Sequence, residues 1–75
     1  MKIEYSKKAD ALYVYFREVE VTQSKEIQEG VVLDFDAQGQ IVGIEVLDAS
    51  VRVGLRDLVN VSIENLPLEM VGEVE

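Results

Sequence analysis

The segment from Val31 to Ser50, VVLDFDAQGQIVGIEVLDAS, constrains the fold more than any other part of this chain. Two runs rich in β-branched residues flank one Asp-Ala-Gln-Gly turn, which is the pattern of a β-hairpin. Asp at the first turn position and Gly at the fourth suit a type I turn, in which Gly39 can adopt a left-handed backbone. The segment therefore predicts two antiparallel strands, over 31–35 and 42–46.

The register of this hairpin stays open at the level of sequence. Alternation puts the apolar residues of the first strand on one face and its aspartates on the other. A simple bulged turn pairs Leu33 with Gly43, whereas matching the apolar sets of the two strands pairs Leu33 with Val42 or Ile44.

The rest of the chain predicts further strands and one helix. Ser50 is expected to cap the helix, because apolar residues then follow at helical spacing. The further strands are expected at 3–5, at 11–16 in the sheet centre, at 19–27 on an edge and at 61–64. The sequence thus predicts an α+β fold, an antiparallel β-meander of five to six strands with one short helix packed on it. We expect a single compact domain over 1–75, in which 66–75 form a loosely ordered acidic tail.

Charge excludes several classes of function. Fifteen acidic and seven basic residues give a net charge of −8, and a field of that sign repels nucleic-acid phosphates. This negative charge favours a basic protein as partner.

The chain has no cysteine and no histidine, which removes disulfides, thiolate metal sites and the usual general base. No apolar run is long enough to cross a membrane or act as a signal peptide, so we expect a cytoplasmic protein.

Size indicates self-association. A chain of 75 residues builds one small core of marginal stability. Apolar residues nevertheless make up 48% of the chain. We therefore expect a homodimer or a higher oligomer.

Two motifs carry a family resemblance. The first is KIEYxxxADALYVY, which begins at Lys2, and the second is VVLDFDxxGxIVGIEVLDAS, which begins at Val31. Together they resemble the YuzE-like family of small prokaryotic proteins, over roughly residues 2 to 50. The resemblance implies a meander with a helix, and no catalytic residues, since that family has no established function. Ser6 departs from the family, whose members more often carry Asp there.

One spacing resembles that of a calcium loop. Counted from Asp34, the third position is Asp36, the sixth is Gly39 and the twelfth is Glu45, as in an EF-hand. An EF-hand needs a helix on each side, whereas both flanks here read as strands. We therefore predict no metal site and no cofactor. Asp34, Asp36 and Glu45 remain the candidate ligands of an alternative function, a domain that binds a divalent cation or a small ligand near the turn.

Enzymatic activity is not expected. Asp34 and Asp36 share a strand face, as paired acid and base groups do, but fifteen acids in so short a chain place some together by necessity. The serines have no histidine or evident lysine partner that would activate them. The sequence contains no recognisable catalytic residues.

The remaining interpretation is a small acidic protein-interaction or regulatory module that self-associates. An exposed edge strand and the negative charge both favour protein contacts. Tyrosine suits such contacts because it joins an apolar ring to a polar tip. The candidate partner-binding residues are Tyr5, Tyr15, Glu18, Glu20 and Glu26.

Overall fold

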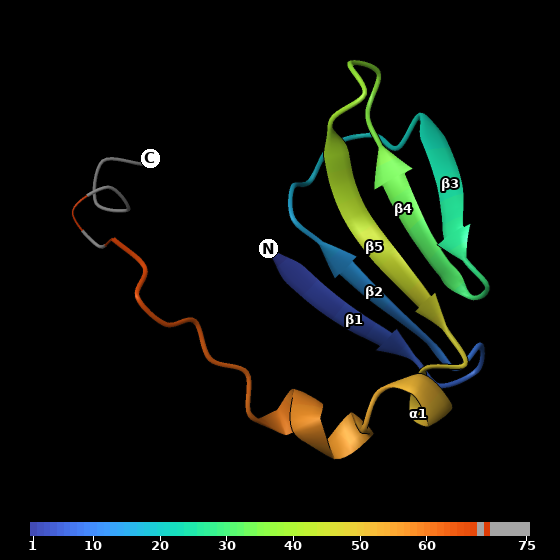
Figure 1. Cartoon of the computed structure of the whole chain (residues 1–75), viewed down its shortest axis with the longest axis vertical. Coiled ribbons are helices and arrows are strands. Elements are labelled where there is room, and N and C mark those ends of the chain that lie inside the picture. The colour runs from blue at the N-terminus through green and yellow to red at the C-terminus, as the bar shows by residue number, and fades with distance from the viewer. Residues whose placement is uncertain (68, 70–75) are drawn as a thin grey trace.

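A computed structural model of the chain describes residues 1–67 and residue 69. Its centre is one five-stranded antiparallel sheet in the order β1-β2-β5-β4-β3 (Figure 1). The strands are β1 (Lys2–Ser6), β2 (Ala11–Tyr15), β3 (Gln23–Gln28), β4 (Val31–Phe35) and β5 (Ile41–Leu47). A short helix, α1 (Ala49–Arg52), and a 3-10 turn, η1 (Leu55–Val59), follow. The fold is α+β in the broad sense and mostly β.

The strand order corrects the prediction of a simple meander. β1 and β2 form one hairpin, β3, β4 and β5 form a meander, and β5 returns to pair with β2. The connection over 16–22 therefore runs from β2, the second strand of the sheet, to β3 at the far edge. Burial explains this order, because the apolar strands β2 and β5 take neighbours on both sides. The wholly exposed β3 takes the edge, as the sequence predicted for this region.

The β4–β5 hairpin adopts one of the two registers considered. Leu33 pairs with Ile44, and Asp34 with Gly43. The register then shifts, so that Phe35 pairs with Ile41. At this shift β5 has one residue more than β4. The apolar residues of the two strands therefore lie on the same face of the sheet.

Register divides the sheet into two unlike faces, because residues that pair directly across an antiparallel ladder share a face. We call one the apolar face; it carries Ile3, Tyr5, Leu12, Val14, Val31, Leu33, Ile44 and Val46. We call the other the polar face; it includes Lys2, Glu4, Tyr13, Tyr15, Ser24, Glu26, Asp34, Gly43 and Glu45. All carboxylates within the five strands belong to the polar face.

The helical region differs from the prediction in its cap. Asp48, in a left-handed conformation with φ 53°, precedes α1 without a side-chain cap, and Ser50 lies inside the helix. Ser50 instead contacts Asp10, to which its backbone N–H and its hydroxyl both donate. Tyr5 donates to the same carboxylate at 2.7 Å. These bonds hold the start of α1 against the β1–β2 hairpin.

Beyond η1 the predicted sixth strand is absent from the described residues. Residues 61–64 have no regular structure, and Val61 and Ile63 are exposed. Of the predicted acidic tail, residues 68 and 70–75 lie outside the described residues. Within residues 1–67 and 69, no helix has the length and apolar character needed to cross a membrane.

The sheet has little core of its own. The fully buried apolar side chains of the described chain are Ala11, Leu12, Val42 and Ala49. Most of the apolar face is only half-buried, and Ile3 is 41% exposed. The single layer therefore leaves much of its apolar surface at the boundary with solvent.

Gly43 is predicted to be essential for the pairing of β5 with β2. A Cβ at this position would overlap the backbone carbonyl oxygen of Val14, which a rigid ladder cannot move aside. We expect Gly43→Ala to lower the free energy of unfolding by about 1–3 kcal/mol, measured by urea denaturation.

Gly54→Ala is the matched control. Its φ of −68° suits alanine, and its Cβ would meet only the carboxylate end of the flexible Asp57 side chain. We expect a change below about 1 kcal/mol. Equal effects of the two substitutions would contradict a close approach at Gly43.

Candidate functional site

The main feature of the polar face is a pair of carboxyl groups, Asp34 on β4 and Glu45 on β5. Asp34 pairs with Gly43, two residues from Glu45 on the same face, so the two side chains meet over a position that has no side chain. Asp34 is only 2% exposed, and the Ser24 hydroxyl donates to its Oδ1 at 2.6 Å. Glu45 is half-buried. A buried acidic group and a half-buried one therefore lie side by side.

Proximity of the two groups changes the acidity of one of them. Hydrogen bonding to Asp34, then partial burial, then repulsion by the Asp34 charge raise the pKa of Glu45 from 4.5 to about 7. The charge of Glu45 therefore changes near neutral pH.

The pair has no positive partner within the part of the chain that the structure describes. No lysine or arginine there forms an ion pair with Asp34 or Glu45. The basic side chains lie elsewhere: Lys2 over Tyr15, Lys7 and Lys8 in the β1–β2 turn, Arg17 on Asp36, Lys25 opposite Leu33, Arg52 beside Gly30 and Arg56 in η1.

Two stacked tyrosines border the carboxyl pair. Tyr13 lies directly opposite Glu45 in the ladder, and Tyr15 lies opposite Gly43. The two rings are nearly parallel, with centroids 6.1 Å apart. Burial and the charges of neighbouring acids, Glu4 first among them, raise the pKa of the Tyr15 hydroxyl. The rings thus stand within the electric field of the carboxylates.

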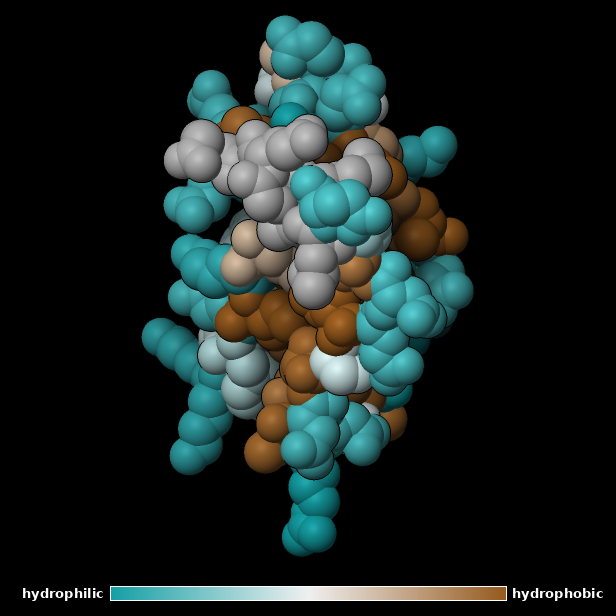
Figure 2. Space-filling model, turned by 90° about the vertical axis from the view of Figure 1, so that its left-hand side faces the viewer, coloured by the Kyte–Doolittle hydropathy of each residue, from teal (hydrophilic) through white to brown (hydrophobic). Residues whose placement is uncertain are grey.

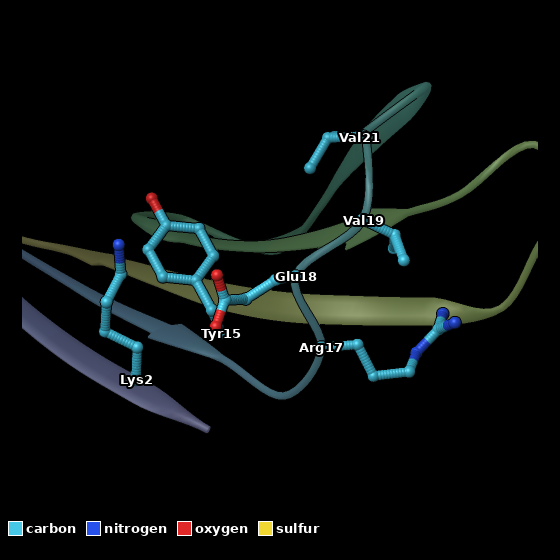
Figure 3. A pocket seen from close by; sticks show the side chains of 6 residues that line it. All are labelled: Lys2, Tyr15, Arg17, Glu18, Val19 and Val21. Atoms are coloured by element: carbon cyan, nitrogen blue, oxygen red, sulfur yellow. The ribbon is translucent and has the colours of Figure 1, made fainter.

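The Tyr15 ring already holds a cation. The ammonium nitrogen of Lys2, whose residue pairs with Tyr15 across β1 and β2, lies 5.3 Å from the ring centroid. This distance is within the range of a cation–π interaction. A hollow of about 270 Å³ opens beside the same ring (Figure 3). Its lining residues are Lys2, Tyr15, Arg17, Glu18, Val19 and Val21.

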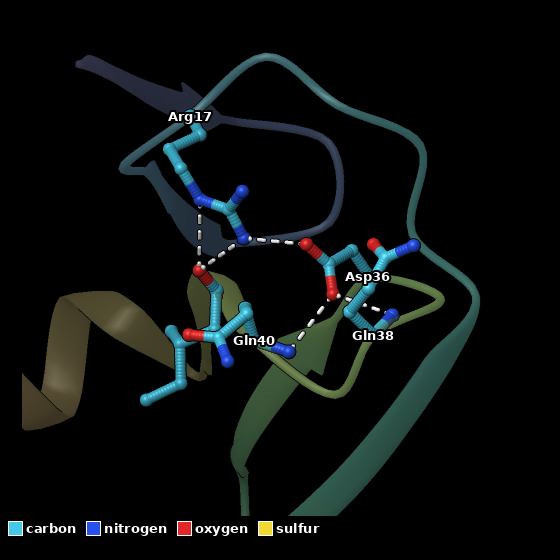
Figure 4. A network of polar contacts seen from close by, with 5 residues as sticks. Arg17, Asp36, Gln38 and Gln40 are labelled. Atoms are coloured by element: carbon cyan, nitrogen blue, oxygen red, sulfur yellow. Dashed lines mark hydrogen bonds and ion pairs between the residues drawn. The ribbon is translucent and has the colours of Figure 1, made fainter.

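A separate polar network surrounds Asp36 at the β4–β5 turn (Figure 4). Asp36 Oδ1 accepts bonds from the backbone N–H groups of Gln38 and Gln40, and Oδ2 accepts one from Arg17 at 2.8 Å. The same guanidinium donates to the Ile41 carbonyl oxygen. These bonds lower the pKa of Asp36, the bond from Arg17 most. Arg17 thereby ties the crossing segment 16–22 to the turn.

The structure separates the three candidate cation ligands. Asp34 and Glu45 form the pair, whereas both oxygens of Asp36 are taken up by Arg17 and the turn amides. Within residues 1–67 and 69 no group of three or more acidic side chains is arranged to hold a metal ion. The calcium-loop spacing therefore spans a hairpin turn in which Asp36 accepts bonds from backbone amides.

The candidate partner-binding residues are dispersed. Tyr5 belongs to the apolar face and bonds to Asp10, while Tyr15 belongs to the polar face. Glu18 lines the hollow, and Glu20 is exposed in the same crossing segment. Glu26 lies at the β3 edge and accepts a bond from the Gly30 backbone. These residues do not form one surface.

Two contributors to the polar site escaped the sequence interpretation: Ser24 and Lys2. Each meets its partner only across neighbouring strands, so the signal lies in strand order and register. Alternation did indicate that Asp34 and Glu45 face away from the apolar residues of their strands. It could not show that β3 and β2 would border them.

Comparison with known proteins gives a family and no function. A family model described as "Protein of unknown function (DUF2283)" matches residues 2–50. No curated protein and no solved structure matches.

The carboxyl pair predicts an unusual dependence of stability on pH. Because folding raises the pKa of Glu45, the folded state binds more protons than the unfolded state between about pH 4.5 and about pH 7. This contribution to stability is present below that window and is lost as pH rises through it. We expect Glu45→Gln to remove the decline, measured by thermal melting at about pH 5 and about pH 8.

Glu29→Gln provides the comparison, since it removes one charge from the exposed β3–β4 turn. It should leave the decline between the two pH values intact. A decline that survives Glu45→Gln unchanged would refute the coupling between Asp34 and Glu45.

Proposed function

Since this chain belongs to the DUF2283 family, whose function is unknown, we propose a function from its own surfaces: a small acidic protein-interaction module that self-associates through the apolar face. The finer resemblance to YuzE-like proteins adds no activity to this proposal. The observation that carries it is a single-layer sheet with one apolar face that the described chain leaves half-covered.

The apolar face has the area of a functional surface patch. Strands about 4.8 Å apart and about 17 Å long give five strands a flat area on the order of 400 Å². The largest apolar patch on a typical monomer covers about 300–600 Å² and is often functional. Seen from the left of Figure 1, where β1 is the nearest strand of the sheet, apolar residues lie at the surface between hydrophilic ones (Figure 2). The apolar face is therefore a candidate for burial against another protein surface.

A second copy of the chain suits this face because of the charge distribution. The strand carboxylates Glu4, Glu26, Asp34 and Glu45 all lie on the polar face. Two copies packed with apolar faces together, about 10 Å apart, would keep these charges on opposite outer surfaces. Lys25 is the charged side chain that the strands add to the apolar face, and it stands at the β3 edge. Repulsion between two chains of charge −8 is thereby reduced.

The polar face would remain free in such a dimer. Its negative charge favours a basic protein as the second partner, and binding of that partner is the way in which the module would act in regulation. The location of this activity in the cytoplasm is part of the proposal.

Self-association predicts a concentration-dependent mass in solution. Ile3 is an exposed member of the apolar face on the edge strand β1, so a charge there should disrupt the interface without disturbing the core. We expect Ile3→Glu to weaken dimerisation by about tenfold or more, measured by sedimentation equilibrium.

Val51→Glu is the matched control, because it adds the same charge at an exposed site on α1, away from the sheet. It should leave the dissociation constant unchanged. A wild-type chain that stays monomeric at about 100 µM would reject self-association, since such an interface should hold at that concentration.

A further inference from the structure

We infer that residues 60–64, which we call the arm, add as an antiparallel strand to the β1 edge of a second copy of the chain, with Glu64 opposite Lys2. This contact rests on the self-association proposed above and adds a second interface to it. The apolar faces can pack together without the arm, so the two proposals fail in different ways.

The arm has the pattern of a strand but stands apart from its own sheet. Its sequence, NVSIE, alternates polar and apolar residues. The Ser62 hydroxyl donates to the Glu64 carboxylate at 3.4 Å, so these two side chains share one side of the segment. Val61 and Ile63, at the alternating positions, are 60% and 68% exposed. Figure 1 shows this part of the chain leaving the sheet. The arm therefore presents an apolar side and a polar side to solvent.

Strand β1 provides the edge that such a segment needs. Within residues 1–67 and 69, β1 pairs with β2 alone. The outer side of an edge strand carries unpaired backbone N–H and C=O groups, to which an extended segment of another chain can bind. Ile3 and Tyr5 on this strand are also exposed members of the apolar face. Backbone and side-chain contacts are thus both available on β1.

One register matches both sides of the arm to β1. The antiparallel pairs are Lys2 with Glu64, Ile3 with Ile63, Glu4 with Ser62, Tyr5 with Val61 and Ser6 with Asn60. The apolar residues of the arm then extend the apolar face, and its polar residues extend the polar face. Opposite charges directly across a ladder stabilise the pairing. Lys2 forms no ion pair within the part of the chain that the structure describes, and Glu64 of the second copy would supply one.

Other registers lose these matches. A slip of one residue puts Val61 and Ile63 on the polar face. A slip of two residues puts Glu64 either opposite Glu4, a like charge, or beyond the end of β1. Parallel pairing that keeps the apolar residues on one face puts Glu64 opposite Glu4 or Ser6. Charge complementarity therefore selects the antiparallel register with Lys2 opposite Glu64.

A second copy suits the arm because every copy offers both halves of the contact. The chain after α1 carries the arm away from its own sheet (Figure 1). Each copy has one arm and one β1 edge, so two copies can exchange arms reciprocally and close a two-fold dimer. The exchange gives each β1 a second neighbour and widens each apolar face by one strand.

Disulfide formation tests the contact directly, because the chain has no cysteine of its own. Residues directly opposite in an antiparallel ladder have Cα atoms about 4.5–5.5 Å apart, a distance that a disulfide spans. A ¹⁵N-labelled Ile3→Cys chain is mixed with an unlabelled Ile63→Cys chain, oxidised and analysed by mass spectrometry. We expect the mixed disulfide to predominate over the two uniform ones.

Ser62→Cys is the matched control for Ile63→Cys, because residue 62 would lie on the other face. Its mixed disulfide with the Ile3→Cys chain should be minor. Equal yields from the two arm positions would overturn the inference. A disulfide within one chain of the double variant Ile3→Cys/Ile63→Cys would also overturn it, since the arm would then lie on its own sheet.

Glu64→Lys tests the charge pair by sedimentation equilibrium. It should weaken dimerisation about tenfold, because the pair occurs twice in a dimer, and adding Lys2→Glu should restore the affinity. Overall charge alone predicts the opposite, since Glu64→Lys makes the chain less negative and reduces repulsion. Glu29→Lys makes the same change in the exposed β3–β4 turn and should not weaken dimerisation.

Sedimentation also separates the two proposals. A dimer that Glu64→Lys leaves unchanged would overturn the arm contact alone and leave packing of the apolar faces in place. A wild-type chain that stays monomeric would overturn self-association and the arm contact together.

Discussion

The pairing of β5 with both β2 and β4 determines what every other strand presents. Residues alternate along β5, so Ile44 and Val46 fix the apolar face while Gly43 and Glu45 fix the polar one. A slip of one residue on either side would exchange the two faces. Gly43 makes this pairing close, because a side chain there would overlap the backbone of β2. The same glycine leaves the space over which Asp34 meets Glu45.

A single layer with two unlike faces is the physical basis of the contacts that we propose for this small chain. An isolated sheet of this size cannot bury both faces, and the described chain fully buries few apolar side chains. One face offers apolar surface, and burial of apolar surface favours contact with another protein without requiring a particular orientation. The other carries the strand carboxylates, whose negative charge is the reason for proposing a basic partner. The proposed association of copies and the proposed recognition of a basic partner thus use separate surfaces of one sheet.

Sequence reasoning reached the local features of the fold and missed those set by distant contacts. The 31–47 hairpin and its alternation were predicted, because turn chemistry and periodicity are local. The strand order was not predicted, because no local pattern indicates that β5 pairs with β2. Nor does a local pattern indicate that Arg17, in the segment 16–22, bonds to the β4–β5 turn. Ser50 was expected to cap a helix, but its bonds go to Asp10, forty residues away. The Asp34–Glu45 pair likewise depended on a register that sequence left open.

The central claim is that the apolar face of one copy packs against that of another. Isotope-filtered NMR on a mixture of ¹³C-labelled and unlabelled chains tests it directly, because the filter detects only contacts between copies. The account predicts intermolecular contacts from the methyl groups of Leu33, Ile44 and Val46, and none from the rings of Tyr13 and Tyr15. Intermolecular contacts confined to the tyrosine rings, or none at a concentration well above the dissociation constant, would contradict it.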